Sequence, residues 1–183
     1  KFKRVTSILI FMALLGLFLR WLFTPSDIPG EEVSIQGRQH LRPDEPAAVY
    51  NSNPPTSGPH DAVSQAPGFY EYEIEDRKLV HSLEHGYIAI SYNCEIGEKG
   101  LNGIKGEEAT GSPQADQGDG SCYELKDYLK DLVKKFGEWK IIAVPRTEND
   151  RRLALTAWGR IDKFNSLDEE RIEKFVKAFR DKG

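Results

Sequence analysis

The fold of this chain is decided by the stretch WKIIAVPRTENDRRLALTAWG, residues 139–159. Residues 139–144 form an apolar run that ends at Pro145, and residues 153–159 form a second run. The polar sequence between them, residues 148–150, is typical of a turn. Both runs are short and rich in aliphatic side chains, as buried strands are. The stretch therefore predicts two strands of one sheet.

Working outward, the sequence predicts another strand and two amphipathic helices. The strand covers residues 86–92 and ends just before Cys94, and the first helix opens at Cys122. The last helix follows the capping sequence of residues 165–168. The apolar residues that share one face of these helices are Leu125, Leu129, Leu132 and Val133 in the first and Ile172, Phe175, Val176 and Phe179 in the last.

This order of elements predicts the fold class. One mixed β-sheet with two amphipathic helices against it satisfies the order strand, helix, strand, strand, helix, which makes the domain α+β. The same order is found in the second half of a thioredoxin-like domain. Because the chain has no Cys-x-x-Cys sequence, disulfide exchange does not follow from that similarity.

The N-terminal segment predicts a transmembrane helix over residues 1–23. Three basic residues precede an uncharged apolar run over residues 5–19, and Trp21 follows the single charge of Arg20. A cleaved signal peptide is the alternative, but no small-residue cleavage pattern follows the run. We therefore expect a retained signal-anchor, with the N-terminus in the cytoplasm and the rest of the chain extracytoplasmic.

Three parts follow from this organisation. They are a transmembrane anchor at residues 1–23, an extended stalk rich in proline and charge at residues 24–48, and a compact domain at residues 49–183. The expected partner is the membrane, crossed once. A complex with another membrane protein, of unknown identity, stays open.

Charge argues against nucleic-acid binding. The formal net charge of the chain is −4, and the four basic residues of residues 1–23 have no acidic counterpart there. Setting those four aside leaves 21 basic against 29 acidic residues, a formal charge of −8. Such a surface repels phosphate backbones.

The cysteine inventory consists of Cys94 and Cys122. In an oxidising compartment one pair of cysteines in one domain predicts a disulfide. The segment between them is polar and acidic and cannot bury itself. Closing a loop of that length stabilises the fold by about 3 kcal/mol in the chain-entropy model.

The chemistry of the chain lies in three histidines, His60, His81 and His85. His60 ends a proline-rich loop, residues 50–60, that holds its last side chain at little entropic cost. His81 and His85 are four residues apart, so a single helical turn presents both on one face. Three imidazoles are a sufficient ligand set for zinc or cupric copper. His40 stands close to two arginines and is interpreted as a solvated linker residue.

The sequence His81-Ser82-Leu83-Glu84-His85 also matches the inverted zinc-protease pattern His-x-x-Glu-His. That site needs several turns of helix, whereas the β-rich run after Gly86 leaves room for at most one turn, so we set the protease aside. A hydrolase in which Glu84 is the general base on metal-bound water remains an alternative. So does an interaction module in which the histidines only support a loop.

The ligand set favours copper over zinc. Met12 is the only methionine, and both cysteines are expected in a disulfide, so soft cuprous copper lacks its preferred ligands. Among divalent ions, imidazole ligands bind copper most tightly. We therefore predict one transition-metal ion, with copper favoured, for metal handling or sensing.

Three motifs carry a resemblance to a known family. They are Tyr50–His60, Val80–Gly86 and Leu155–Arg160. Over residues 46–181 the chain resembles a bacterial family of membrane-anchored proteins, domain-of-unknown-function family 3105. The resemblance implies one N-terminal span and one extracytoplasmic domain, and it implies no established activity. This chain departs from the family in having Asp61 after His60, where an aromatic residue is frequent, and in its long acidic insert between the cysteines.

Overall fold

The computed structural model describes residues 11–20, 28–46, 48–97 and 120–183. Residues 11–20 are helical. The other elements, in chain order, are β1 (Glu31–Glu32), β2 (His40–Leu41), β3 (His60–Asp61), β4 (Gly68–Phe69), α2 (Asp76–Glu84), β5 (Ile88–Tyr92), α3 (Gly120–Lys135), β6 (Ile141–Pro145), β7 (Leu153–Ala157), β8 (Arg160–Phe164) and α4 (Glu169–Phe179). The strands predicted around residues 86–92, 139–144 and 153–159 are β5, β6 and β7.

The main sheet has six strands in the order β1-β8-β7-β5-β6-β4. β6 runs parallel to both β4 and β5, whereas β7 pairs antiparallel with β5 and with β8. The sheet is therefore mixed, and the α+β prediction with helices against a mixed sheet is confirmed for the compact domain. A separate two-stranded sheet joins β2 and β3 in parallel.

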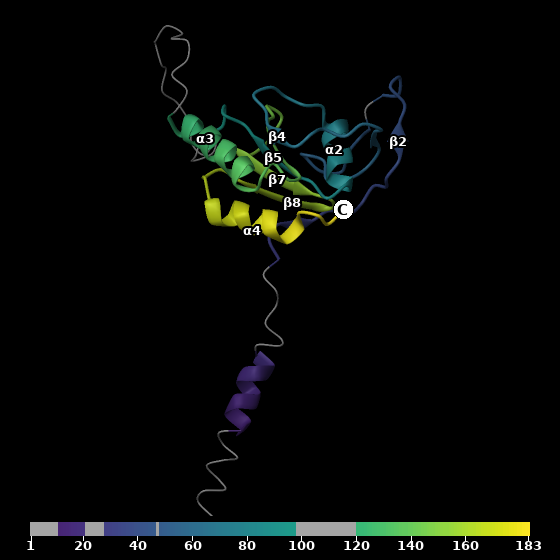
Figure 1. Cartoon of the computed structure of the whole chain (residues 1–183). Coiled ribbons are helices and arrows are strands. Elements are labelled where there is room, and N and C mark those ends of the chain that lie inside the picture. Colours follow the sequence, from purple (N-terminus) through teal and green to yellow (C-terminus); the bar gives the residue numbers. More distant parts are fainter. Residues whose placement is uncertain (1–10, 21–27, 47, 98–119) are drawn as a thin grey trace, which may run out of the picture.

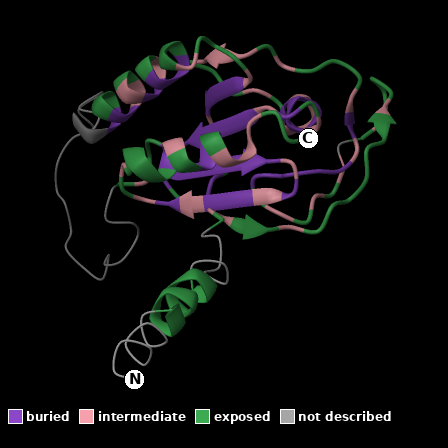
Figure 2. Cartoon of the chain, turned by 60° about the horizontal axis from the view of Figure 1, so that its bottom comes forward, coloured by how far each residue is buried: buried purple, intermediate pink, exposed green. Residues whose placement is uncertain are grey.

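Helices cover both faces of the main sheet (Figure 1). Along β6, Ile141 and Ala143 belong to the apolar cluster that includes residues of α3 and α4. The alternate residues Ile142 and Val144 cluster with Leu79 of α2 on the opposite face. This two-residue period places α3 and α4 on one side and α2 on the other. Figure 2 shows the result: the central strands β5, β6 and β7 are largely buried, α3 and α4 carry exposed residues on their outer sides, and α2 has no exposed residue.

β8 is a strand that the sequence analysis missed. It returns from β7 through a tight turn in which Gly159 has a φ of +69°. Charged residues in β8 hide the strand pattern. One of them, Asp162, is nevertheless buried, because Arg171 of α4 donates two hydrogen bonds to it, at 2.8 and 2.5 Å. A paired carboxylate can thus occupy a position that looks exposed in the sequence.

α2 is longer than predicted. The sequence around His81 predicts at most one helical turn, but the helix has nine residues, Asp76–Glu84. The residues before His81 extend it, since Leu79, Val80 and Leu83 bury one face against the sheet. Tertiary packing of this apolar face outweighs the low helix propensity of β-branched and polar residues.

The transmembrane helix predicted over residues 1–23 is wrong. No helix within the described residues is long and apolar enough to cross a membrane. The helical residues 11–20 would span about 15 Å, half of a hydrocarbon core of about 30 Å. Residues 1–10 and 21–23 lie outside the described part of the chain. The single-pass localisation, with a cytoplasmic N-terminus and an extracytoplasmic domain, depended on that helix and is corrected with it.

Two further predictions concern connections. The segment at residues 24–48, expected as an extended stalk, contributes β1, which pairs with β8, and β2, which pairs with β3. The disulfide between Cys94 and Cys122 is confirmed, and it joins the chain just after β5 to the start of α3. Most of the polar insert between the two cysteines lies outside the described residues.

Candidate metal centre

His60 is positioned by the proline-rich loop that precedes it. Within this loop Gly58 has a φ of +125°, and a Cβ at this position would meet the Tyr50 ring at 3.2 Å. The Tyr50 hydroxyl donates to the Pro59 carbonyl at 2.8 Å, which closes the loop on itself. The backbone N–H of His60 then donates to the Gln39 carbonyl at 2.9 Å. The loop therefore delivers His60 to β3 with its side chain fully buried.

α2 supplies the second histidine and the carboxylate. His81 and Glu84 lie in its last turn, and His85 follows as the C-cap residue. His81 is buried, Glu84 is half-buried and His85 is exposed. The helix thus presents a series of ligand groups that runs from the interior to the surface.

His40 is the histidine that sequence reasoning missed. In the parallel pairing of β2 with β3, His40 lies directly beside His60. The two arginines that argued against it are each paired with a carboxylate. Arg38 donates to Glu84 at 3.2 Å, and Arg42 pairs with Glu45 at 3.3 Å. Their charges are therefore partly neutralised by carboxylates, and no local sequence signal reports this.

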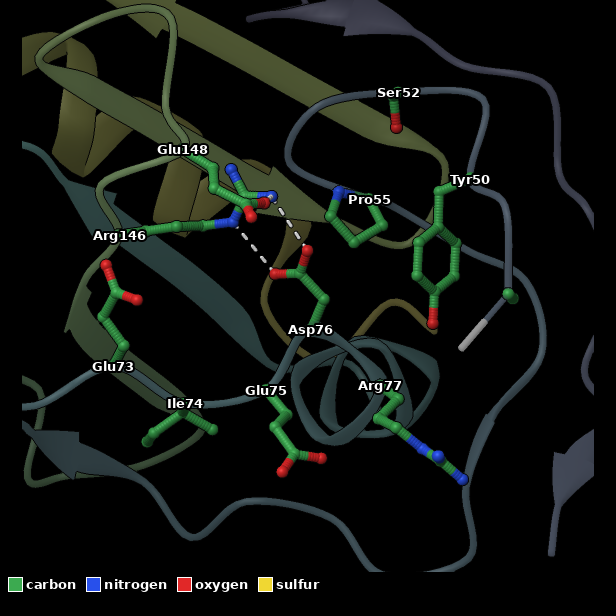
Figure 3. Close-up of a pocket in the computed structure, with 11 residues that line it drawn as sticks. Tyr50, Ser52, Pro55, Glu73, Ile74, Glu75, Asp76, Arg77, Arg146 and Glu148 are labelled. Carbon is green, nitrogen blue, oxygen red and sulfur yellow. Dashed lines mark hydrogen bonds and ion pairs between the residues drawn. The ribbon is translucent and has the colours of Figure 1, made fainter. Parts of the chain in front are cut away.

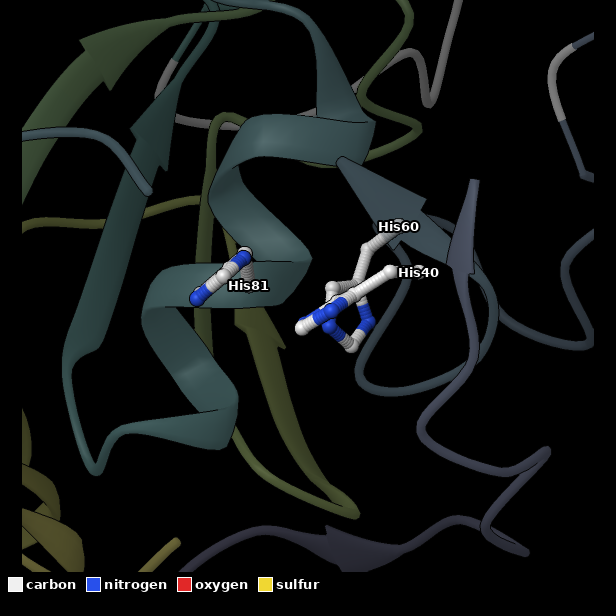
Figure 4. Close-up of side chains that lie close together, drawn as sticks. All are labelled: His40, His60 and His81. Carbon is white, nitrogen blue, oxygen red and sulfur yellow. The ribbon is translucent and has the colours of Figure 1, made fainter. Parts of the chain in front are cut away.

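The four histidines of the chain form one cluster. Ring centroids are 5.0 Å apart for each pair among His40, His60 and His81, and 4.7 Å apart for His81 and His85. Figure 4 shows His81 on α2 beside His60 and His40 on the paired strands β3 and β2.

Two groups of potential ligands overlap at His81. One contains His40, His60 and His81, and the other contains His81, Glu84 and His85. In each group the ligand atoms lie within 4.8 Å of one another. Donor atoms around a tetrahedral ion are about 3.3 Å apart when the metal–nitrogen bonds are 2.0–2.1 Å. Small side-chain shifts would therefore bring either group onto an ion, and the cluster could hold a metal.

The predicted ligands His60, His81 and His85 are thus divided between these groups. His60 and His81 belong to the first, and His81 and His85 belong to the second. Within the described residues no single group contains all three.

Backbone carbonyls fix two of the rings. His60 Nδ1 lies 2.7 Å from the Gly58 carbonyl, and His81 Nδ1 lies 2.5 Å from the Asp61 carbonyl. A carbonyl only accepts, so each Nδ1 carries the hydrogen and each Nε2 keeps a lone pair in the neutral ring. This is the arrangement found around metal-ligating histidines, whose second nitrogen donates to a fixed acceptor.

His60 Nε2 is a buried nitrogen that has no hydrogen bond. The nearest carboxylate oxygen, Glu84 Oε2, is 3.1 Å away, but the geometry does not make a hydrogen bond. Burial lowers the pKa of His60, more strongly than the Gly58 carbonyl and Glu84 raise it. The ring is therefore neutral near pH 7, which is the form that binds metals. Buried polar atoms without partners are rare in proteins.

Glu84 lies between the histidines and Arg38. Burial raises the pKa of Glu84, but the hydrogen bond from Arg38 and the nearby histidines lower it further, so the net shift is downward. The Arg38 guanidinium also stacks over the Trp158 ring at 4.7 Å. The carboxylate is therefore ionised and held in one orientation. It is a potential ligand and a weak proton acceptor.

A cavity of about 630 Å³ is the alternative candidate site (Figure 3). Its charged side chains are largely engaged with one another. Arg146 donates to both oxygens of Asp76, at 3.0 and 2.8 Å, and to Glu148 at 3.2 Å. Glu73 accepts from the backbone N–H of Thr147 at 2.6 Å, which lowers the pKa of Glu73. The polar groups that a ligand would need thus already stabilise the fold.

Fold and site together define an α+β domain with a histidine cluster between a helix end and a small parallel sheet. The chain belongs to the family described as "Protein of unknown function (DUF3105)", whose model matches residues 40–115 and 118–183. The matched residues include all four histidines. No curated protein and no solved structure matches the chain. The similarity to a thioredoxin-like second half therefore stays a prediction.

Proposed function

We propose that this DUF3105 protein binds one transition-metal ion through His40, His60 and His81, and that it serves metal handling or sensing. The observation that carries the proposal is the gathering of these three imidazoles, whose ligand atoms lie within 4.8 Å of one another and include the buried Nε2 of His60, which makes no hydrogen bond. A ligand bond would satisfy this nitrogen without breaking an existing hydrogen bond.

Copper is favoured over zinc. The cysteines form a disulfide, so no thiolate is available to select zinc or cuprous copper. An all-imidazole set suits both cupric copper and zinc, and the affinity order of divalent ions favours copper. The partly exposed carboxylate of Glu84 is compatible with either ion.

Binding is a better supported function than hydrolysis. A general base must take a proton, and both the lowered pKa of Glu84 and its hydrogen bond from Arg38 oppose this. Glu84 is better suited to ligate an ion. We therefore place the protein among binding proteins rather than among metal-dependent hydrolases.

Calorimetric titration of the full chain with Cu²⁺ and with Zn²⁺ tests the proposal. We expect one ion per chain, a dissociation constant in the micromolar range or below, and tighter binding of Cu²⁺. His40→Gln should weaken binding at least ~10-fold. This substitution alters an exposed side chain, so the fold should persist.

Asp44→Asn is the matched control, since it removes an exposed charge near His40 and no ligand. It should leave the affinity unchanged. Binding weaker than micromolar for both ions would refute the proposal and support an interaction module. Equal weakening in both variants would contradict the role of His40 as a ligand.

A further inference from the structure

The two overlapping ligand groups differ in their surroundings. The first extends from buried His60 to exposed His40 on β2, and the second extends from buried His81 to exposed His85 at the end of α2. The histidine cluster therefore reaches solvent at two exposed side chains that belong to different elements. Buried imidazoles lie between these two ends.

His81 can serve only one ion at a time. Its Nδ1–H donates to the Asp61 carbonyl, so Nε2 is the nitrogen with a lone pair. That nitrogen is 2.8 Å from Nε2 of His85. Because His81 Nε2 is the acceptor, the hydrogen between the two rings belongs to His85. A single lone pair cannot bind an ion in both groups at once.

From this arrangement, and resting on the proposed function, we propose that His81 is the shared ligand of a two-position transfer path for one ion. In one position His40, His60 and His81 hold the ion. In the other position His81, Glu84 and His85 hold it. The ion enters at one exposed histidine and leaves at the other, which makes the protein a metal-transfer protein rather than a permanent metal store.

The transfer is a ligand exchange that involves no redox step. The ion keeps its bond to His81, loses its bonds to His40 and His60, and gains bonds to Glu84 and His85. Glu84 Oε2 lies 3.1 Å from His60 Nε2, so this carboxylate is adjacent to the ligand being released. His85 is exposed, so its ring hydrogen can move through solvent from Nε2 to Nδ1 before Nε2 binds. No net proton or electron is gained or lost.

Stoichiometry is the first test. We expect the full chain to bind one Cu²⁺ at saturation by native mass spectrometry. His40→Gln and His85→Gln should each still bind one ion, at the position that remains. The double variant should bind none at the same concentration. Two ions bound at once to the wild-type chain would overturn the proposal.

Exchange kinetics are the second test. Cu²⁺ bound near His60 should quench Trp158, whose ring centroid is 6.3 Å from that of His60. Release of Cu²⁺ to EDTA, followed by this fluorescence, should slow at least ~10-fold in His85→Gln while the equilibrium affinity stays near that of the wild type. Trp139→Phe, which removes an exposed tryptophan, should lower the total fluorescence but leave the Cu²⁺-dependent change and its rate unchanged.

The two failures are distinguishable. If the wild-type chain binds no Cu²⁺, the proposed function fails together with the transfer path. If it binds one ion tightly but His85→Gln releases Cu²⁺ as fast as the wild type does, only the transfer path is refuted.

Discussion

The histidine cluster and the hydrogen-bond network of Arg146 with Asp76 and Glu148 both contact the same loop, residues 50–60. They differ in whether their buried polar atoms have hydrogen-bond partners. Asn53 in this loop accepts from Arg146 at 2.5 Å, and every nitrogen of the Arg146 guanidinium has a partner. His60, at the end of the loop, has a buried Nε2 with no hydrogen bond. A satisfied network stabilises the fold, whereas a buried lone pair beside two further imidazoles could bind a metal ion.

The sharpest way to test this contrast is to break the satisfied network. Arg146→Met should lower the free energy of unfolding by about 3 kcal/mol, because it leaves the Asp76 carboxylate without its partner. Urea denaturation measures this loss. Arg151→Met, at an exposed arginine, is the control and should change stability little. Equal losses in the two variants would mean that the network is not specifically stabilising.

Adding Cu²⁺ tests the histidine cluster, the second region of the comparison. With free Cu²⁺ at 100 times the dissociation constant, the free energy of unfolding should rise by about 2.7 kcal/mol, because the ion binds the folded state. EDTA should reverse the gain, and His60→Gln, which removes a ligand of the first position only, should make the gain smaller. Thermal denaturation with and without Cu²⁺ provides the measurement. An unchanged midpoint for the wild type would argue that the His60 lone pair has no metal ligand.

A substitution in the loop of residues 50–60, which contacts both regions, should change the free energy of unfolding by a smaller amount. Gly58→Ala should cost about 2 kcal/mol, since it combines a positive φ with a contact of the new Cβ to the Tyr50 ring. It should also weaken Cu²⁺ binding, because the Gly58 carbonyl orients His60.

Gly37→Ala is the matched control for this loop variant. Gly37 has a φ of +105° and nothing within 4 Å of an added Cβ, so its variant carries backbone strain alone. Stability measurements on both variants isolate the contact with Tyr50. A loss of Cu²⁺ affinity in Gly37→Ala as large as that in Gly58→Ala would contradict the role of the loop.

The smallest expected effect concerns Arg38, at the border of the histidine cluster. Arg38→Gln should cost about 0.2–1 kcal/mol at pH 7, since the pair with Glu84 is partly exposed. The pKa of Glu84 is lowered in the fold, so the pair stabilises above the ordinary value of 4.5 and this stability is lost as the pH falls below it. Urea denaturation at pH 7 and pH 3 should show a larger difference between wild type and variant at pH 7 than at pH 3.

The sequence predicted much of the fold and part of the site. Alternating or continuous apolar runs identified β5, β6 and β7, and helical spacing identified α3 and α4. β8 was missed because a buried ion pair allows Asp162 inside. α2 was underestimated because its stability comes from an apolar face packed on the sheet rather than from propensity.

For the site, the sequence alone determined which side chains can bind a metal. These are the four histidines and Glu84, since the two cysteines form a disulfide. Only the tertiary structure decided which of them meet. The parallel pairing of β2 with β3 brings His40 beside His60 across 20 residues of chain. At the end of α2, His81 is buried whereas His85 is exposed. Pairing between distant strands is set by global packing and not by local pattern, so no reading of the residues around His40 could have placed it there.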